Sequence, residues 1–203
     1  LRWEKQQITL TQQNKFPYEE QSMLSLQLAS PKVFSVFIRK PSWLQGKKLN
    51  IRVDGKEVAV ALNSEGYVEL RRKWRDGDNV LVELPMKNEL DRLPDNSNWV
   101  SIRRGPVVLA AVSDTTDLVK TSGDGGRFDH IAPGPLYDLS QSPVLLLDSA
   151  KSKQELNQAL EPVKGQPLHY TIPSIIAQSN YKRLKLVPFY EVQDDRYMLY
   201  WPF

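Results

Sequence analysis

Apolar and polar residues alternate along the first half of the chain with the period of two that is typical of half-buried β-strands. In the first clear run, Leu24, Leu26 and Leu28 lie on one face, and the polar residues between them lie on the other. The pattern recurs with apolar positions at Phe34, Val36 and Ile38, at Leu49, Ile51 and Val53, and at Val58, Val60 and Leu62. Asp54-Gly55 between the last two segments predicts a tight hairpin, because glycine tolerates a positive φ.

The segment 66–86, GYVELRRKWRDGDNVLVELPM, predicts a further hairpin. Tyr67 to Trp74 forms the first strand, Asp76-Gly77 supplies the turn, and the alternating apolar residues after it form the second strand. Trp74 stands just before the turn, where a tryptophan either stacks on a sugar or closes a hydrophobic core. The local pattern leaves both interpretations open.

The second half of the chain is less regular. Residues 106–112, PVVLAAV, are typical of a central strand covered on both faces. From residue 113 the composition becomes rich in Ser, Thr, Asp and Gly, which predicts a long loop or an inserted subdomain. SKQE at 152–155 matches a capping box and predicts one short helix over 152–160. Strand character returns near the end, in RLKLVPFYEV and RYMLYWPF.

These short strands predict an all-β fold, an antiparallel β-sandwich of jelly-roll type with a second, smaller β-rich region and at most one or two short helices. We divide the chain into three parts on this basis. Residues 1–112 form a β-sandwich domain, residues 113–183 a smaller irregular, β-rich and insertion-like region, and residues 184–203 the terminal strands.

The composition is that of a soluble globular protein, with 40% hydrophobic and 25% charged residues in a chain of 203. The formal charge of +3 is too small and too evenly spread to indicate nucleic-acid binding. No long apolar run occurs, so no membrane span is expected, and the first residues lack the apolar segment of a signal peptide. The chain starts without Met, which suggests a fragment or a processed form.

The sequence contains none of the short catalytic motifs GxSxG, GxGxxG, HExxH or the Walker loop. The absence of cysteine excludes disulfides, zinc-thiolate sites and cysteine nucleophiles within these residues. His130 and His169 are interpreted as loop or capping histidines rather than as metal or triad residues. Asp124-Gly125-Gly126 with Asp129 offers oxygen ligands for calcium, but its spacing favours an ordinary glycine turn.

Two further groups of residues bear on a role in carbohydrate chemistry. The neighbouring Asp194 and Asp195 would point to opposite faces of an extended strand, so they predict a turn rather than a catalytic carboxylate pair. The five tryptophans suggest sugar-stacking platforms, but we favour a core or domain-interface role for most of them. The candidates for contact with a carbohydrate or with another domain are Trp43, Trp74 and Trp99.

Several ordered motifs resemble a known family. IRKPSW at 38–43, GYVELRRKWRDGDNVLVELPM at 66–86 and RRGPVVLAA at 103–111 resemble the region downstream of the catalytic barrel in glycoside hydrolase family 127 and its close relative family 146. HIAPGPLYDL at 130–139 and LVPFYEVQDDRYMLYW at 186–201 resemble the C-terminal segment of Bacteroides-type members. Together these motifs cover nearly the whole chain.

The resemblance implies a β-L-arabinofuranosidase-like parent, which has an N-terminal (α/α)6 barrel followed by β-sandwich domains and acts on plant arabinan-type and hydroxyproline-linked sugars. The implied chemistry uses a cysteine nucleophile at a zinc site made by further cysteines and a glutamate. None of these residues can be carried over to a chain without cysteine. The chain is therefore expected to be a non-catalytic accessory region with no cofactor of its own, and zinc is implied for the missing catalytic domain.

The resemblance also carries expectations about partners and structure. The expected partner is the upstream catalytic barrel of the same polypeptide, with a homodimer and a plant glycan as further partners and a periplasmic or secreted location. The alternative function is a carbohydrate-binding module that recognises arabinose-containing glycans. The terminal strands 184–203 are expected to return to the first sandwich, and Trp74 to close that sandwich or to meet the barrel. Gln193 replaces a histidine that relatives often carry, so any contact made by that histidine is in doubt here.

Overall fold

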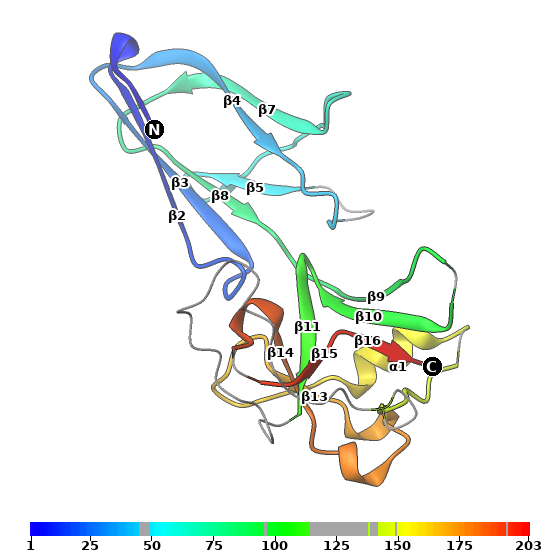
Figure 1. Cartoon of the computed structure of the whole chain (residues 1–203). Helices are drawn as coiled ribbons and strands as arrows, with labels where there is room; N and C mark the ends of the chain where they lie inside the picture. Colours follow the sequence, from blue (N-terminus) through cyan, green and yellow to red (C-terminus); the bar gives the residue numbers. More distant parts are fainter. Residues whose placement is uncertain (45–48, 96, 114–137, 139–141, 149, 194) are drawn as a thin grey trace, which may run out of the picture. The chain divides into compact units, whose positions relative to one another are not determined.

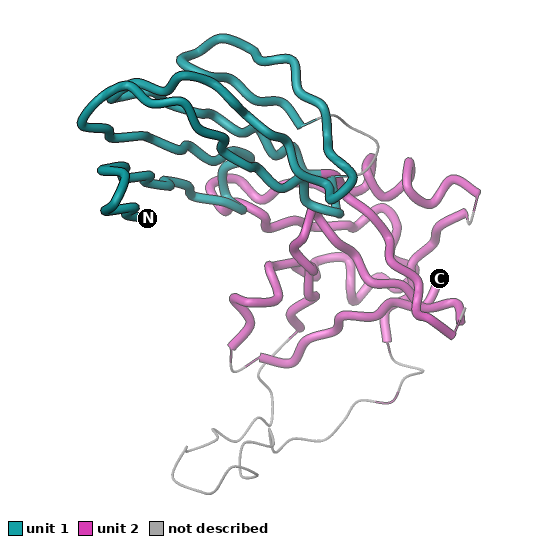
Figure 2. The backbone as a smooth tube through the Cα atoms, turned by 90° about the horizontal axis from the view of Figure 1, so that it is seen from above, with its two compact units in different colours: residues 1–86 teal, residues 87–203 magenta. Residues whose placement is uncertain are grey.

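The computed structural model describes residues 1–44, 49–95, 97–113, 138, 142–148, 150–193 and 195–203 (Figure 1). The chain forms two compact units, unit 1 at Leu1–Met86 and unit 2 at Lys87–Phe203 (Figure 2). Most of the first part of the loop predicted from residue 113, and most of the motif at 130–139, fall outside the described residues. No helix of the described part is long and apolar enough to cross a membrane.

Unit 1 contains two antiparallel sheets. The larger sheet has the order β1 (Arg2–Trp3), β2 (Ile8–Asn14), β3 (Gln21–Leu28), β8 (Asn79–Glu83), β5 (Asn50–Val53) and β6 (Lys56–Glu57). The smaller sheet pairs β4 (Lys32–Arg39) with β7 (Tyr67–Trp74) along their whole length. A short 3-10 helix, η1 (Glu4–Gln6), joins β1 to β2.

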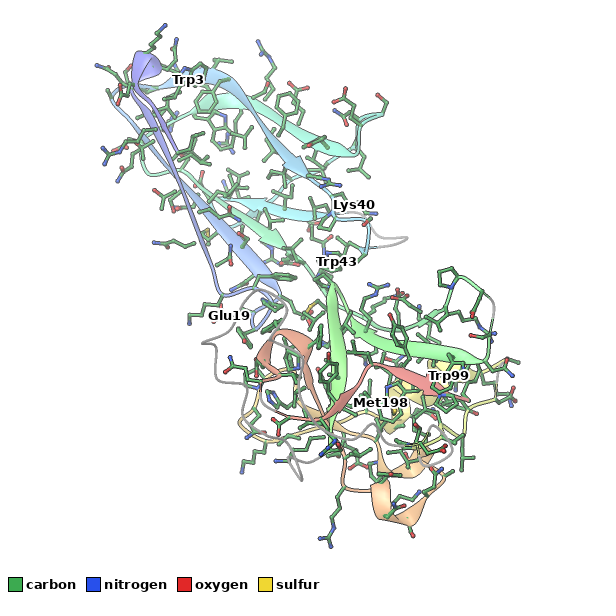
Figure 3. All side chains as sticks on the ribbon, in the orientation of Figure 1. Trp3, Glu19, Lys40, Trp43, Trp99 and Met198 are labelled. Atoms are coloured by element: carbon green, nitrogen blue, oxygen red, sulfur yellow. The ribbon has the colours of Figure 1, made fainter. Side chains whose placement is uncertain are left out.

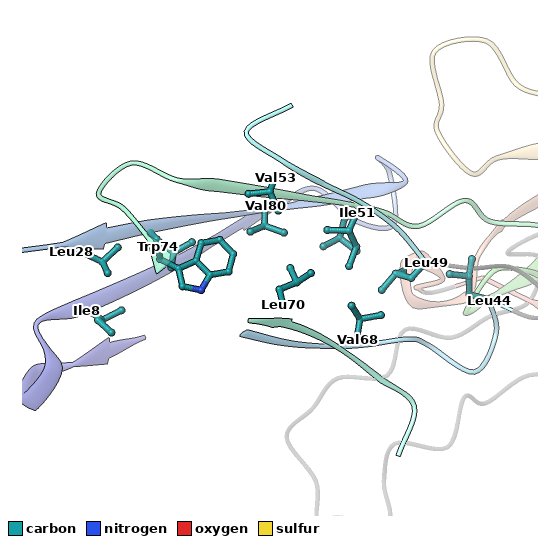
Figure 4. Close-up of a cluster of buried hydrophobic side chains, with 12 residues drawn as sticks. Ile8, Leu28, Leu44, Leu49, Ile51, Val53, Val68, Leu70, Trp74 and Val80 are labelled. Carbon is teal, nitrogen blue, oxygen red and sulfur yellow. The ribbon is translucent and has the colours of Figure 1, made fainter. Parts of the chain in front are cut away.

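The core of unit 1 lies between these two sheets (Figure 4). The larger sheet contributes Leu26, Ile51 and Val80, which are fully buried, and the smaller sheet contributes Val68, Leu70 and Trp74. The predicted inward positions Phe34, Val36 and Ile38 of β4 are partly buried and pack against the same cluster. Alternation with a period of two therefore identified the faces of these strands correctly.

The segment 66–86 is not the hairpin that its turn residues predict. β7 pairs with β4 in the smaller sheet, whereas β8 pairs with β3 and β5 in the larger one. The turn around Asp76-Gly77 therefore carries the chain across the core from one sheet to the other. Three long-range hydrogen bonds hold it on β3: Gly77 N–H to Leu26 O at 2.9 Å, Leu26 N–H to Asp78 O at 3.0 Å and Leu28 N–H to the Asp76 carboxylate at 2.9 Å.

The hairpin predicted at Asp54-Gly55 is confirmed. Both turn residues have positive φ, 50° and 76°, and they connect β5 to β6. The predicted return strand through Val58, Val60 and Leu62 is shorter than expected, because β6 ends at Glu57. Leu62 instead forms an isolated bridge with Val68 of β7.

Unit 2 is built on an antiparallel sheet with the order β12 (Glu161–Pro162), β13 (Tyr170–Thr171), β14 (Lys185–Pro188), β11 (Val107–Val112), β10 (Trp99–Arg104) and β16 (Tyr200–Pro202). β15 (Tyr197–Met198) pairs with β11, and β9 (Asn88–Arg92) pairs with β10. The described residues of this unit include the 3-10 helices η3 (Pro173–Ile175), η4 (Ser179–Tyr181) and η5 (Phe189–Glu191) between strands.

β11 is a central strand of this sheet, as its unbroken apolar sequence predicts. It has β10 and β14 as neighbours, and three consecutive residues, Leu109, Ala110 and Ala111, are almost fully buried. Because successive side chains point to opposite faces, three buried residues in a row require cover on both faces.

The predicted short helix is α1 (Ser152–Ala159), the single α-helix of the described residues. Its N-cap is Lys151, and no side chain caps its first turn, so the expected capping box at 152–155 is not formed. The Glu155 carboxylate instead accepts a hydrogen bond from the backbone N–H of Asp148 at 2.8 Å. Leu156 and Leu160 are buried, so the apolar spacing predicted the packed face correctly.

The all-β, sandwich-like fold is therefore confirmed, but the chain divides at Met86 rather than at residue 112. The reason is strand pairing, because β9, β10 and β11 pair with one another and with β14, β15 and β16. The terminal strands do pair with residues 99–112, but those residues belong to unit 2. β12 and β13, from the region 113–183, join this same sheet.

Candidate functional site

The three candidate tryptophans lie in different environments. Trp74 has 0% exposure and lies in the core of unit 1 (Figure 4). Its indole N–H donates to Phe34 O at 3.0 Å, and the guanidinium of Arg72 lies 5.1 Å from the ring centroid. A buried ring has no free face for a sugar, so Trp74 is a core residue and is removed from the carbohydrate candidates.

Trp43 is half-buried in the segment after β4, where Figure 3 labels it. Its ring stacks on Phe16, with ring centroids 5.7 Å apart and an interplanar angle of 20°, and it packs against the core cluster of unit 1. One face of the indole is therefore occupied by Phe16. The geometry is that of a packing residue at the edge of the core.

Trp99, which Figure 3 labels, lies at the start of β10. It lines an open groove of about 590 Å³ in unit 2. Two further aromatic residues, Tyr197 and Tyr200, line the same groove, together with Leu93, Met198 and Leu199. Its polar lining residues are Asp95, Ser97 and Ser142. We call this site the Trp99 groove.

Strand alternation explains why Trp99 and Tyr200 face the same side of the sheet. Val100 and Trp201 form a cross-strand pair, and both are buried on the inner face. Their chain neighbours Trp99 and Tyr200 therefore point to the outer face. Since Trp99 pairs with Pro202 and Ser101 with Tyr200, the two rings are diagonal neighbours, about 7–8 Å apart at the backbone.

Asp95 lies in the loop between β9 and β10, which is closed by a backbone hydrogen bond from Leu93 N–H to Trp99 O at 3.2 Å. The backbone N–H of Ser97 donates to Asp95 Oδ1 at 2.9 Å and holds the pKa of this carboxyl below its ordinary value of 3.8. Asp95 is therefore ionised at neutral pH and can only accept hydrogen bonds. The Trp99 groove thus combines the exposed rings of Tyr197 and Tyr200 and the half-buried ring of Trp99 with one negative charge.

A second hollow in unit 2, of about 660 Å³, has a more polar character. His169 Nδ1 lies 2.9 Å from Pro167 O, and its Nε2 lies 3.5 Å from a carboxylate oxygen of Glu191. Arg183, Lys185 and Asp195 also line this hollow, so charges of both signs are mixed there. His169 itself lies in the loop before β13, as the sequence suggested.

As lined by the described residues, neither hollow brings together the further residues that the sequence suggested for a metal or catalytic site. Within the described ranges, no three His, Asp or Glu side chains are placed to hold a metal ion. The calcium candidate at Asp124-Gly125-Gly126 and Asp129, and the histidine His130, lie outside those ranges. Asp194 is also outside them, so the predicted turn at Asp194-Asp195 is not described.

Sequence reasoning missed Tyr197 and Tyr200, which are 51% and 47% exposed. From the sequence, tryptophans alone are predicted as sugar platforms, and RYMLYWPF is predicted only as a strand. The alternation within that segment carries a usable signal, because a buried Trp201 requires Tyr200 to face the other side. The pairing of this strand with Trp99 could not be inferred from local sequence.

Two family models match the chain, and they meet at the boundary between the two units. Residues 1–86 match the model described as "Beta-L-arabinofuranosidase, GH127 middle domain". Residues 89–203, more than half of the chain, match DUF4986, a domain of unknown function. No curated protein matches the chain.

Solved structures show the same fold. A GH127 β-L-arabinofuranosidase from Geobacillus stearothermophilus T6 is 18% identical, with a TM-score of 0.58 over 100% of this chain and 31% of that one. A GH127 β-arabinofuranosidase is also 18% identical, with a TM-score of 0.57 over 100% of this chain and 32% of its own. A glycoside hydrolase gives 18% identity and a TM-score of 0.54 over 96% and 32%. The chain thus spans about a third of the length of the solved proteins it matches.

Proposed function

The chain belongs to the DUF4986 family through residues 89–203, and we propose that it is a non-catalytic accessory region of a family 127-like glycoside hydrolase. The observation that carries this proposal is the match of residues 1–86 to a GH127 middle domain. The same residues form a compact unit with a core of their own. The coverage of about a third of each solved relative supports a larger parent protein.

In this proposal the region packs on the (α/α)6 catalytic barrel of the parent and supports its geometry. A supporting domain needs apolar side chains for its partner, and the outer face of β4 presents two of them, opposite charged residues of β7. Val33 and Phe37 are 59% and 56% exposed, on the face opposite to Phe34 and Val36. Burial of two such side chains would contribute a few kcal/mol of association free energy, at about 1.5–3 kcal/mol for each fully buried residue.

The catalytic residues of the proposed parent would come from the barrel. The chain contains no cysteine, so it can supply neither a cysteine nucleophile nor a zinc thiolate. Its residues therefore do not fit the zinc site that the family resemblance implies, and we derive no catalytic step from them. A homodimeric parent and a periplasmic or secreted location belong to the proposal and rest on the resemblance alone.

A second candidate function is carbohydrate binding, and the Trp99 groove is the observation that favours it. Aromatic rings beside hydrogen-bonding groups suit a sugar, which presents C–H surfaces and hydroxyl groups together. Trp43 and Trp74 do not support this function, because Phe16 covers one face of the first and the second is buried.

The supporting role can be tested by producing the catalytic barrel of the parent enzyme and residues 1–203 as separate polypeptides. Sedimentation and calorimetry should show a one-to-one complex, and the purified 203-residue chain alone should not hydrolyse a chromogenic β-L-arabinofuranoside. If the two polypeptides stay separate at micromolar concentration, the supporting role is wrong. Activity of the 203-residue chain that a single substitution within it abolishes would overturn its non-catalytic assignment.

A further inference from the structure

The outer surface beside β10 has the two properties that a sugar requires of a protein. Trp99 and Tyr200 present neighbouring rings on one face of the sheet, and Tyr200 is 47% exposed. Tyr197, which is 51% exposed, lines the same groove. Large apolar groups are normally buried, so three aromatic residues around one open groove call for an occupant with an apolar face.

The occupant must also present hydroxyl groups, because the polar lining of the Trp99 groove can bind them. The Asp95 carboxylate uses one oxygen to accept from Ser97 N–H, and it can accept further bonds from donors in the groove. Bonds from hydroxyl groups to a carboxylate are charge-assisted and stronger than bonds between neutral groups.

We infer that the Trp99 groove is a binding site for a neutral sugar residue of a glycan, with Trp99 and Tyr200 as stacking platform and Asp95 as acceptor for the sugar hydroxyls. This inference rests on the proposed function, since an accessory region of a glycoside hydrolase is exposed to glycans. It adds the role of each residue and a preference between classes of glycan.

The preference follows from charge. A uronic acid in the groove would bring its carboxylate within several ångström of Asp95, and the two negative charges would repel each other. At about 6 Å in an aqueous environment this repulsion weakens binding by about threefold, and by more where water is excluded. The site is therefore selective for neutral over acidic glycans of the same length.

The test is calorimetric titration of the 203-residue chain with neutral arabino-oligosaccharides and, in parallel, with oligogalacturonides of equal length. A shallow open site predicts a dissociation constant on the order of 1 mM for the neutral ligand. The acidic ligand should bind at least about threefold more weakly. Absence of saturable heat with the neutral ligand at about 10 mM, or tighter binding of the acidic one, overturns the inference.

Four variants test the role of each residue in binding. Trp99→Ala and Tyr200→Ala should each weaken binding of the neutral ligand by about tenfold, while Trp99→Phe should keep most of it. Asp95→Asn should weaken neutral binding and reduce the difference between neutral and acidic ligands. Thermal unfolding of each variant shows whether it is folded, and Tyr200→Ala and Asp95→Asn change side chains outside the core. Unchanged binding in Trp99→Ala and Tyr200→Ala contradicts the stacking role.

Tyr190→Ala is the matched control, because Tyr190 is 53% exposed in η5 and does not line the Trp99 groove. It should bind the neutral ligand like the unsubstituted chain, and equal losses in Tyr190→Ala and Trp99→Ala count against a specific site. The titration needs no barrel. A negative result therefore leaves the supporting role intact, and failure of the supporting role leaves a positive titration intact.

Discussion

The indole N–H of Trp74 donates to the backbone carbonyl of Phe34 at 3.0 Å, and this bond joins the end of β7 to β4 across the smaller sheet of unit 1. The two rings also contact each other, with centroids 5.9 Å apart. The bond satisfies the polar atom of a fully buried side chain, so the tryptophan can fill the core without leaving a donor unpaired.

Replacement of this side chain should destabilise unit 1 strongly. Trp74→Ala is predicted to lower the free energy of unfolding by about 3 kcal/mol, because a large buried ring is lost and a cavity is left. Trp74→Phe should cost less, about 1–2 kcal/mol, since it keeps most of the volume but leaves Phe34 O without its donor. Urea denaturation measures both values, and a loss well below about 1 kcal/mol in Trp74→Ala would show that the ring is not a core residue.

The turn that crosses between the sheets should be sensitive to a side chain at Gly77. Gly77 has φ of 84°, and no atom lies within 4 Å of the position that a Cβ would occupy. Gly77→Ala is therefore predicted to cost about 1 kcal/mol through backbone strain rather than through a clash. Gly77→Asn should cost less, since Asn tolerates this conformation better. Equal stability of the two variants in urea would contradict a conformational cause.

Arg103 holds β9 and β10 together through carboxylates. Its guanidinium bonds to Asp91 at 2.6 Å and to Glu89 at 3.0 Å, and both Arg103 and Glu89 are largely buried, with side chains 17% and 14% exposed. Arg103→Ala should lower the free energy of unfolding by about 2 kcal/mol, and Arg103→Lys should recover only part, because lysine cannot form the forked contact. Exposed Lys164→Ala is the control and should change stability by less than about 0.5 kcal/mol.

The contribution of Arg103 to the free energy of unfolding is expected to be independent of pH near neutrality. The hydrogen bond to Asp91, supported by Coulombic attraction to Asp91 and Glu89, raises the pKa of Arg103 above its ordinary value. A raised pKa gives a contribution that is fully present below the unfolded-state value and is lost only as the pH rises through the folded-state value. The difference in stability between Arg103→Lys and the unsubstituted chain should therefore stay constant between about pH 7 and about pH 9. A steep change within that range would point to another titrating group.

The proposed barrel contact makes a prediction for the outer face of β4. Phe37→Lys should leave the stability of the 203-residue chain within about 0.5 kcal/mol, because Phe37 is 56% exposed there. In complex formation with the separate barrel, the same change should weaken affinity by at least about tenfold, since it places a charge in an apolar contact. Leu62→Lys is the control, because Leu62 is also exposed in unit 1 but lies outside β4. If the two variants bind the barrel with equal affinity, β4 is not part of the contact.

The sequence predicted individual strands better than their partners. Alternation found the buried faces of β3 and β5, and the unbroken apolar run found the central position of β11, because both signals depend on neighbouring residues. The hairpin prediction for residues 66–86 was wrong, since an Asp-Gly turn suits a hairpin and a crossing between sheets equally well. Contacts such as Gly77 with Leu26 and Trp74 with Phe34 decide between the two, and they are far apart in the chain.

The candidate site, too, depends on strand pairing that local sequence does not predict. Composition drew attention to Trp99, but the groove depends on the pairing of β10 with β16, whose residues are about 100 positions away in the sequence. Exposure also separates residues of one type, because Trp74 and Trp201 are buried whereas Trp99 lines a groove. Residue type alone therefore could not divide the tryptophans into core and surface groups.

Heat inactivation of the proposed parent enzyme, with and without residues 1–203, tests the supporting role most directly. Residual hydrolysis of a chromogenic β-L-arabinofuranoside is measured after incubation at a series of temperatures. The proposal predicts that deletion of residues 1–203 lowers the temperature of half-inactivation by at least about 4 °C, because the barrel loses a stabilising partner. An equally active and equally heat-stable barrel without these residues would contradict it.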